Sequence, residues 1–410
     1  MTRPRLLFLA QTLAYPPHSG VANRTFNVMM QLQRAFDVHL LAFSRRNHQP
    51  DAPSRLTAQA ALAERLSRVA TAVPVPAEAS RPARVWCHLR SVVTARPYTY
   101  YEYASPEFGR ALARMVEEVR PDLIHLDSLD LYRWLDALPG VPVAVTHHSV
   151  ESDLLRLRAR RIRPRALAPY LAFQAVLLER IERQLCPGVC LNVMMSETDA
   201  ARLERLAPGS PTVTVPNGVD VAYFRPDGLL PVVPGRVVFL GPTYMYPNRD
   251  AVDFFLEEIW RAVRAAVPGA ELHLVGKNPP ADRARYLAHD GVICHGYVPD
   301  IRPLLGQAAC SVVPLRIGGG TRLKILDSWA MGAAIVSTTV GCEGLEAHDG
   351  RNMLIRDRPG EFAEAVVAVL RHDALRCRLS AAGRETVERS YGWDPIGDRL
   401  IRAYRGLLGA

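Results

Sequence analysis

Short apolar runs alternate with helix-patterned stretches along the whole chain, and this alternation limits the possible folds more than any other feature. In the first half we expect strands at residues 6–10, 38–43, 69–75, 123–126, 141–146, 191–195 and 212–215, and helices at 21–36, 56–66, 108–120 and 199–206. In the second half we expect strands at 237–240, 272–275, 292–294, 311–314, 334–337 and 353–355, and helices at 251–266, 301–308, 324–331 and 361–370. Short apolar strands separated by helices are typical of parallel sheets covered on both faces. We therefore predict an α/β protein with doubly wound, Rossmann-like domains whose ligands collect beyond the carboxyl ends of the strands.

An internal repeat indicates two similar domains. Residues 5–17 (RLLFLAQTLAYPP) and 236–248 (RVVFLGPTYMYPN) share Arg, Phe, Leu, Thr, Tyr and Pro at a constant offset. Each segment resembles a strand, a Pro-containing loop and the start of a helix, near Gly20 and near Arg249. Between the halves, residues 216–228 (PNGVDVAYFRPDG) are dense in turn formers. We place the domain boundary there, with domains at 1–215 and 216–392.

Residues 310–339 (CSVVPLRIGGGTRLKILDSWAMGAAIVSTT) predict a strand, a glycine turn, a helix and a second strand. The turn at Gly319, Gly320 and Thr321 would let the backbone approach a ligand, and the helix would direct its first N–H groups and its positive dipole end at that ligand. Arg322 and Lys324 add two positive charges in the first turn, where cations are unfavourable unless an anion is present. We predict a phosphate site.

The distribution of lysine strengthens this prediction. Of fifty basic residues only two are lysines, Lys277 and Lys324, and each follows glycine in an expected strand-to-helix turn. A compact ammonium group suits a point contact to a phosphate oxygen. The alternative is that a general preference for arginine leaves two lysines at these places by chance, and for Lys277 the two interpretations are equally favoured.

Composition excludes several classes of protein. The formal charge of +9 would suit nucleic acid, an anionic membrane or a phosphorylated substrate, but no nucleic-acid recognition motif accompanies it. Neither GxGxxG nor GxxxxGK[ST] occurs, so a dinucleotide enzyme or P-loop ATPase lacks its fingerprint. Seven cysteines without a paired framework fit a reducing, cytoplasmic compartment. We expect no signal peptide, because the apolar run at 6–10 is short, and no membrane-spanning helix.

Several motifs, taken together in their order, resemble the retaining glycosyltransferases of family 4, which have the GT-B fold. These motifs are HSGVANRTFNVM, HHSVES, MMSETDAARL, VPNGVDVAYF, PLRIGGGTRLKILD, VGCEGL and YGWDPIGDRLIRAYRGLL. The resemblance implies two Rossmann-like domains facing a cleft, with a C-terminal helix at 393–410 that packs back on the first domain. It implies transfer of a sugar from a nucleotide diphosphate sugar to a glycan or lipid-linked acceptor, with retention of configuration and without a metal or other cofactor.

The resemblance also assigns residues. His148 matches the histidine that reaches the donor sugar from the first domain, although the neighbouring His147 could be the one that points inward. Asp327 takes the position of an acidic residue that holds the ribose hydroxyls, and a carboxylate can accept both hydrogen bonds. Lys324 and Arg322 would neutralise the leaving diphosphate.

Two further residues complete the expected donor site. Gly20 would allow the first domain to approach the donor or acceptor closely. Tyr297, in the HGYVPD segment that matches the base-reading loop, could stack on the base, or it could equally pack on its own domain.

The sequence departs from the family pattern at three positions. Gly319 replaces the first acidic residue of the family motif, and Pro242 and Asn248 stand where many members have an arginine and a lysine that grip the diphosphate. Arg322 and Lys324 could substitute for them. These departures leave open a catalytically impaired sugar-nucleotide-binding protein, or another GT-B enzyme such as a nucleotide-sugar epimerase.

Two charged segments have structural alternatives. Residues 154–185 carry six arginines between 156 and 165 beside apolar residues, which would suit an anionic membrane surface, or else a solvated helix face over buried residues. Asp127 and Asp130 resemble a metal-binding pair, but we interpret them as loop and helix-start residues.

Overall fold

A computed structural model describes residues 3–17, 20–66, 68–69, 72–162, 164–226, 231–317 and 322–409. The chain divides into two compact units, the first made of Met1–Pro216 with Asp394–Ala410 and the second of Asn217–Trp393.

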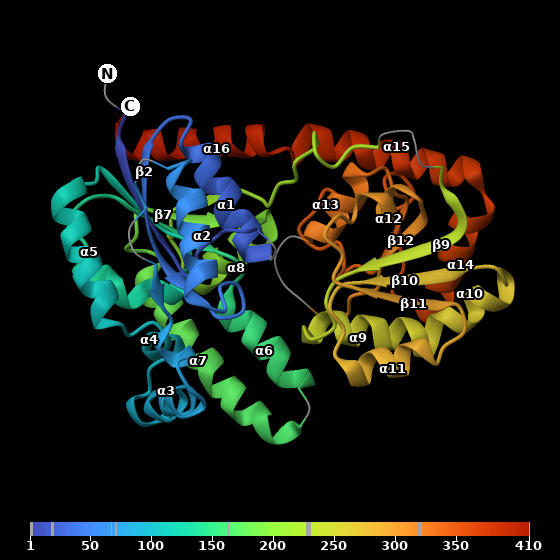
Figure 1. Cartoon of the computed structure of the whole chain (residues 1–410), viewed down its shortest axis with the longest axis horizontal. Helices are drawn as coiled ribbons and strands as arrows, with labels where there is room; N and C mark the ends of the chain where they lie inside the picture. Colours follow the sequence, from blue (N-terminus) through green and yellow to red (C-terminus); the bar gives the residue numbers. More distant parts are fainter. Residues whose placement is uncertain are drawn as a thin grey trace. The chain divides into compact units, whose positions relative to one another are not determined.

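The first unit is a parallel sheet with the strand order β3-β2-β1-β5-β6-β7-β8, and β4 also pairs with β2 (Figure 1). Its strands are β1 (Arg5–Ala10), β2 (Asp37–Ser44), β3 (Arg68–Val69), β4 (Val73–Pro74), β5 (Leu123–Leu126), β6 (Val143–His147), β7 (Leu191–Met194) and β8 (Thr212–Thr214). Its helices are α1 (Gly20–Leu32), α2 (Ala52–Ala63), η1 (Pro76–Glu78), α3 (Arg81–Thr94), α4 (Tyr98–Glu102), α5 (Pro106–Val119), η2 (Leu129–Ala137), α6 (Glu151–Arg161), η3 (Arg165–Leu167), α7 (Ala168–Leu185), α8 (Glu197–Leu206) and α16 (Trp393–Leu407).

The second unit is also a parallel sheet, with the order β11-β10-β9-β12-β13-β14. Its strands are β9 (Val233–Leu240), β10 (Glu271–Val275), β11 (Val292–Gly296), β12 (Ala308–Val313), β13 (Ile335–Ser337) and β14 (Leu354–Ile355). Its helices are α9 (Tyr246–Phe254), η4 (Phe255–Ile259), α10 (Trp260–Ala266), α11 (Pro280–Leu287), α12 (Arg302–Gly306), α13 (Leu323–Ala330), α14 (Pro359–Arg371) and α15 (Asp373–Ser390). These two sheets confirm the predicted α/β class with doubly wound units.

Strand β9 shows why the apolar runs are continuous. Val237 and Phe239 belong to one buried cluster, while Val238 and Leu240 belong to another. Because neighbouring strand residues point to opposite faces, both faces of the sheet are covered by helices (Figure 1).

Several elements differ from the sequence predictions. The strand expected at 69–75 is two short strands, β3 and β4, both paired with β2. The helix expected at 251–266 is a succession of α9, a π-helical turn η4 and α10. Helix α3 was not among the expected elements.

Helix α16 packs on the first unit through its apolar side. Tyr404 is fully buried, forms a hydrogen bond with His125 of β5 and packs edge-on against Phe36. Arg34 pairs with Asp398 at 2.8 Å. These contacts fix the terminal helix against β5 and against the segment between α1 and β2.

Helix α13 is held in the second unit by Trp329, which is completely buried and donates a hydrogen bond from Nε1 to the Asn352 carbonyl at 3.0 Å. A methyl group on Gly383 of α15 would lie 2.3 Å from the Trp329 ring, so the close approach of α15 and α13 requires glycine there. Ser328 and Ser311 form a buried hydrogen bond of 2.9 Å between α13 and β12. The first turn of α13 is therefore set on a rigid support.

Candidate functional site

The strand order of the second unit reverses between β9 and β12, and in doubly wound sheets ligands bind beyond the carboxyl ends at such a reversal. Two segments leave the sheet there. The loop after β9 leads into α9, and the loop after β12 leads through the glycine turn into α13. Gly319, Gly320 and Thr321 of this turn lie outside the described residues.

Lys324 joins the two segments. Its Nζ donates a hydrogen bond to Asn248 Oδ1 at 2.8 Å and lies 4.4 Å from the centre of the Phe239 ring. Asn248 is 8% exposed and donates from Nδ2 to the Pro242 carbonyl at 3.0 Å. The ammonium group is thus held at the reversal point by an amide rather than by a carboxylate.

Glycine is required beneath this contact. Gly241 has φ +141°, and a Cβ there would lie 2.7 Å from Asn248 Nδ2. Gly276 has φ +137°, and its Cβ would meet the Gly241 backbone at 2.7 Å. The loops after β9 and β10 therefore pack backbone against backbone, which leaves room for the Asn248 side chain.

The pKa of Lys324 is far below the usual value for lysine, although the side chain is only partly buried. Burial, and secondly the nearby positive charge of Arg322, lower the pKa of Lys324 to about 7. Arg322 is 9% exposed, precedes the first residue of α13 and donates from Nη2 to the Val340 carbonyl at 3.3 Å. An anion placed beside both groups would relieve their repulsion and restore the charge of Lys324.

Asp327 lies three residues after Lys324, so both side chains project from the same face of α13. Burial raises the pKa of Asp327 to about 7. None of the residues that the structure describes donates a hydrogen bond to this carboxylate. The Asp327 carboxylate is therefore able to accept hydrogen bonds from hydroxyl groups of a ligand.

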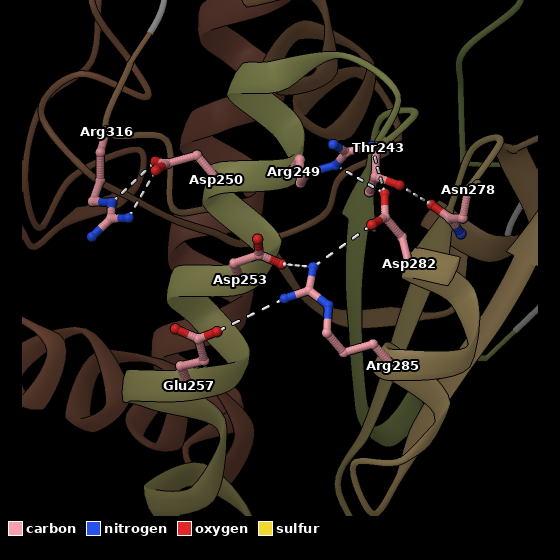
Figure 2. Close-up of polar contacts among 9 residues, drawn as sticks. All are labelled: Thr243, Arg249, Asp250, Asp253, Glu257, Asn278, Asp282, Arg285 and Arg316. Carbon is pink, nitrogen blue, oxygen red and sulfur yellow. Dashed lines mark hydrogen bonds and ion pairs between the residues drawn. The ribbon is translucent and has the colours of Figure 1, made fainter. Parts of the chain in front are cut away.

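A network of ion pairs fixes the helix that carries Asn248 (Figure 2). Arg249 pairs with Asp282 of α11 at 2.8 Å, and Arg316, in the loop after β12, pairs with Asp250 at 2.8 Å. Arg285 of α11 reaches Asp253 at 2.7 Å. Helix α9 is thus tied to the segments on both sides of it, and Asn248 is positioned by them.

The neighbouring strands β10 and β11 bring Lys277 and Tyr297 together. Both side chains are exposed, and Lys277 Nζ lies 5.7 Å from the centre of the Tyr297 ring. Tyr297 is 53% exposed. These two residues and Lys324 all lie at the carboxyl edge of one sheet.

In the first unit the adjacent residues His147 and His148 differ in their hydrogen-bond partners. His147, the last residue of β6, is 2% exposed and bonds through Nε2 to Asn192 Oδ1 at 2.9 Å, and burial lowers its pKa to about 4. Burial lowers the pKa of His148, the charge of Asp127 opposes this shift, and the charge of Arg24 adds to it. His148 Nε2 is buried and has no hydrogen-bond partner among the described residues.

His148 lies near a buried polar group at the strand-order reversal of this unit, between β1 and β5. Asp127, directly after β5, accepts a hydrogen bond from Thr25 of α1. Arg24 donates to the carbonyls of Val215 and Pro216, each at 2.9 Å. Our sequence interpretation gave no role to Arg24 or Thr25, because nothing local to them signals a partner so distant in the chain.

The positions of the predicted residues Gly20 and Asp130 add little about the site. Gly20 is exposed and is the first residue of α1. Asp130 lies in the first turn of η2, where its N–H donates to Ser128 Oγ at 3.1 Å.

Within the described part of the chain no group of three or more His, Cys, Asp or Glu side chains could hold a metal ion. Likewise, none of the described helices is long and apolar enough to cross a membrane.

Comparison with known families decides the class of this site. Residues 18–223 match the family model described as Glycosyltransferase Family 4, and residues 234–372 match the one described as Glycosyl transferases group 1. The chain belongs to glycosyltransferase family 4. It is a glycosyltransferase, as the sequence motifs indicated.

Individual relatives agree with this family 4 assignment. The chain is 28% identical over 370 residues to the phosphatidyl-myo-inositol mannosyltransferase of Mycolicibacterium smegmatis, covering 85% of this chain and 89% of that protein. Among solved structures, sucrose-phosphate synthase from Thermosynechococcus elongatus superposes with a TM-score of 0.72 over 99% of each chain, at 17% identity. Anabaena HepE in complex with UDP and glucose has a TM-score of 0.68 at 11% identity, over 98% of this chain and 100% of that one. These structures show the GT-B fold.

Proposed function

We propose that this glycosyltransferase moves a hexosyl group from a nucleoside diphosphate sugar to a lipid-linked or glycan acceptor, with retention of configuration and without a metal. The observation that carries the proposal is the Lys324–Asn248 contact at the strand-order reversal, in a chain of family 4. It presents a cation whose full charge the surrounding protein does not satisfy, at the edge where nucleotides bind in such sheets.

In the proposed reaction the bond between the anomeric carbon and the diphosphate breaks, and the anomeric carbon forms a bond to an acceptor hydroxyl oxygen. The hydroxyl proton leaves with the departing phosphate. The barrier is dominated by negative charge growing on that phosphate, and Lys324 and Arg322 stabilise it. Asp327 holds the ribose hydroxyls, Lys277 and Tyr297 lie on the base side, and His148 contacts the donor sugar.

Mannose and an inositol phospholipid are the first substrates to test. The support is the relative of similar length, a phosphatidyl-myo-inositol mannosyltransferase. An acceptor of this kind would bring the enzyme to the cytoplasmic face of a membrane as a peripheral protein.

Two alternative functions would give different results in an assay. A sugar-nucleotide-binding protein that has lost catalysis, suggested by Gly319 and Asn248, would bind nucleotide without transfer. A nucleotide-sugar epimerase would convert the donor without an acceptor. Both are separated from a transferase by following donor and acceptor in the same reaction.

The test is a transfer assay with GDP-mannose, UDP-glucose and other nucleotide sugars against phosphatidylinositol and glycan acceptors, each with and without EDTA. We expect one donor to give an acceptor-dependent product with the anomeric configuration of the donor, undiminished by EDTA. Binding without product across the panel, or sugar conversion without acceptor, would overturn the proposal.

A further inference from the structure

Helix α3 of the first unit turns its large apolar side chains to solvent. They follow one another at helical spacing and form the surface that we call the α3 stripe: Val85, Trp86, Leu89, Val92 and Val93. Trp86 is 61% exposed and Val93 85% exposed. Single exposed apolar residues are common, but a continuous stripe containing a tryptophan is not.

The opposite face of α3 holds the helix to the protein through polar side chains and through Cys87, which packs against the buried core cluster. Ser91 is fully buried and accepts a hydrogen bond from Gln174 Nε2 of α7 at 2.7 Å. His88 Nδ1 forms a hydrogen bond of 2.6 Å with the hydroxyl of Tyr170, also on α7. Figure 1 shows α3 beside α4 and α7. The usual arrangement of an amphipathic surface helix is therefore reversed.

Positive charge surrounds the stripe. Arg81, Arg84, Arg90 and Arg96 are all exposed, and the sequence contains no acidic residue between Glu78 and Glu102. The guanidinium group of Arg90 lies 4.7 Å from the centre of the Tyr101 ring. Such a face complements a surface that is both apolar and anionic.

The segment at 154–185, which the sequence suggested for membrane contact, has a different arrangement. Leu155 of α6 is buried against Ala175 and Leu178 of α7, and Arg156 pairs with Asp153 and Glu179. Among the described residues of α6, only Leu157 is a large apolar side chain that is exposed, at 40%. The His88–Tyr170 hydrogen bond nevertheless ties the start of α7 to α3.

We propose that α3 is an interfacial helix, which lies in the plane of an anionic membrane with the α3 stripe among the acyl chains and its arginines at the lipid phosphates. Apolar burial and electrostatic attraction both contribute to binding of this kind. The inference goes beyond sugar transfer, because it needs only the first unit's surface and no donor.

Trp86 provides a direct probe. The chain has five tryptophans, and the other four, Trp134, Trp260, Trp329 and Trp393, are buried. A blue shift of tryptophan emission on adding vesicles, and its quenching by brominated acyl chains, therefore reports insertion of Trp86.

The experiment uses the full chain with phosphatidylcholine vesicles, with and without phosphatidylglycerol, at low and high salt. We expect flotation and a blue shift only with the anionic lipid, weakened at least tenfold by high salt. Trp86→Ser and Leu89→Ser should reduce binding at least tenfold. The matched control Leu56→Ser, at an equally exposed leucine of α2 (62%), should leave it unchanged.

Each outcome decides the question. No flotation at low salt, or flotation unaffected by the two α3 variants, would overturn the proposal. A change in sedimentation of the wild-type protein that Trp86→Ser abolishes would mean instead that a second copy covers the stripe. Thermal shifts with nucleotides, measured on the same variants, should be unchanged, so failure here is distinguishable from failure of the donor-site proposal.

Discussion

Lys324 and Asn248, 76 residues apart in the chain, meet through a 2.8 Å hydrogen bond that joins the first turn of α9 to the first turn of α13. In the sequence, Asn248 stands where many members of the family have a cationic residue. In the structure it is instead the group that positions the remaining lysine. An amide can do so without neutralising the charge that a diphosphate would need.

Asn248→Asp tests this relationship. A carboxylate beside Lys324 would raise the pKa of the lysine and repel a diphosphate, so the affinity for GDP or UDP should fall about tenfold or more, since hydrogen bonds to charged groups contribute about 1.5–3 kcal/mol. Isothermal titration calorimetry at pH 7 measures it. Asn278→Asp adds the same charge nearby but can still accept from Thr243, so it should lose little affinity. Equal losses would contradict a specific role for Asn248.

Lys324→Met should reduce turnover about 100-fold or more, because a cation at a departing oxyanion is worth that much in comparable sites. The fold should persist. Lys324 has a lowered pKa in the native state, so removing it should raise stability at pH 7 and below, and this gain should vanish as the pH rises toward the unfolded pKa of lysine. Thermal denaturation across pH checks the sign. Arg358→Met, at an 84% exposed cation of the same unit, is the control.

Donor binding should take up a proton. Burial lowers the pKa of Lys324 to about 7, and a bound diphosphate would raise it. Between pH 7 and 8.5 the affinity for nucleoside diphosphate should therefore fall with rising pH. Calorimetry in buffers of different ionisation enthalpy should show uptake in the wild type. The uptake should disappear in Lys324→Arg, whose charge does not titrate in this range, and persistence there would assign the proton to another group.

Asp327→Asn should weaken recognition of ribose specifically. Wild-type protein should prefer GDP over 2′-deoxy-GDP, and the variant should lose about tenfold of that preference, since an amide accepts hydrogen bonds less strongly than a carboxylate. Competition binding with both nucleotides gives the ratio. If affinity fell equally for both nucleotides, Asp327 would not contact the sugar hydroxyl.

Replacing His147 should affect mainly stability, and replacing His148 should affect mainly turnover. His147→Ala removes a buried hydrogen bond to Asn192 and should destabilise the protein by about 1–3 kcal/mol. His148→Ala should leave stability almost unchanged and lower kcat, because its Nε2 has no partner among the described residues and is proposed to act on the donor. Chemical denaturation and steady-state kinetics on both variants make the comparison. A loss of stability for His148→Ala that matched the loss for His147→Ala would give both residues a structural role.

Much of this chain could be predicted because its signals are local. Each buried strand of a parallel sheet is a continuous apolar run, so β1, β9 and β12 are visible in the sequence, and lysine was rare enough for Lys324 to stand out. The family motifs supplied the roles that single residues could not.

Other features depend on which distant segments pack together. Local pattern could not distinguish His147 from His148, because the two differ only in which neighbours the sheet places against them. The stripe on α3 was missed for the same reason, since helical spacing of apolar residues does not reveal whether their face is covered. The sequence by itself determined the alternation of strands and helices, the strand-to-helix turn that carries Lys324 and the family. Only tertiary structure decided the partner of Lys324 and the face that α3 exposes, because contacts between segments far apart in the chain set both.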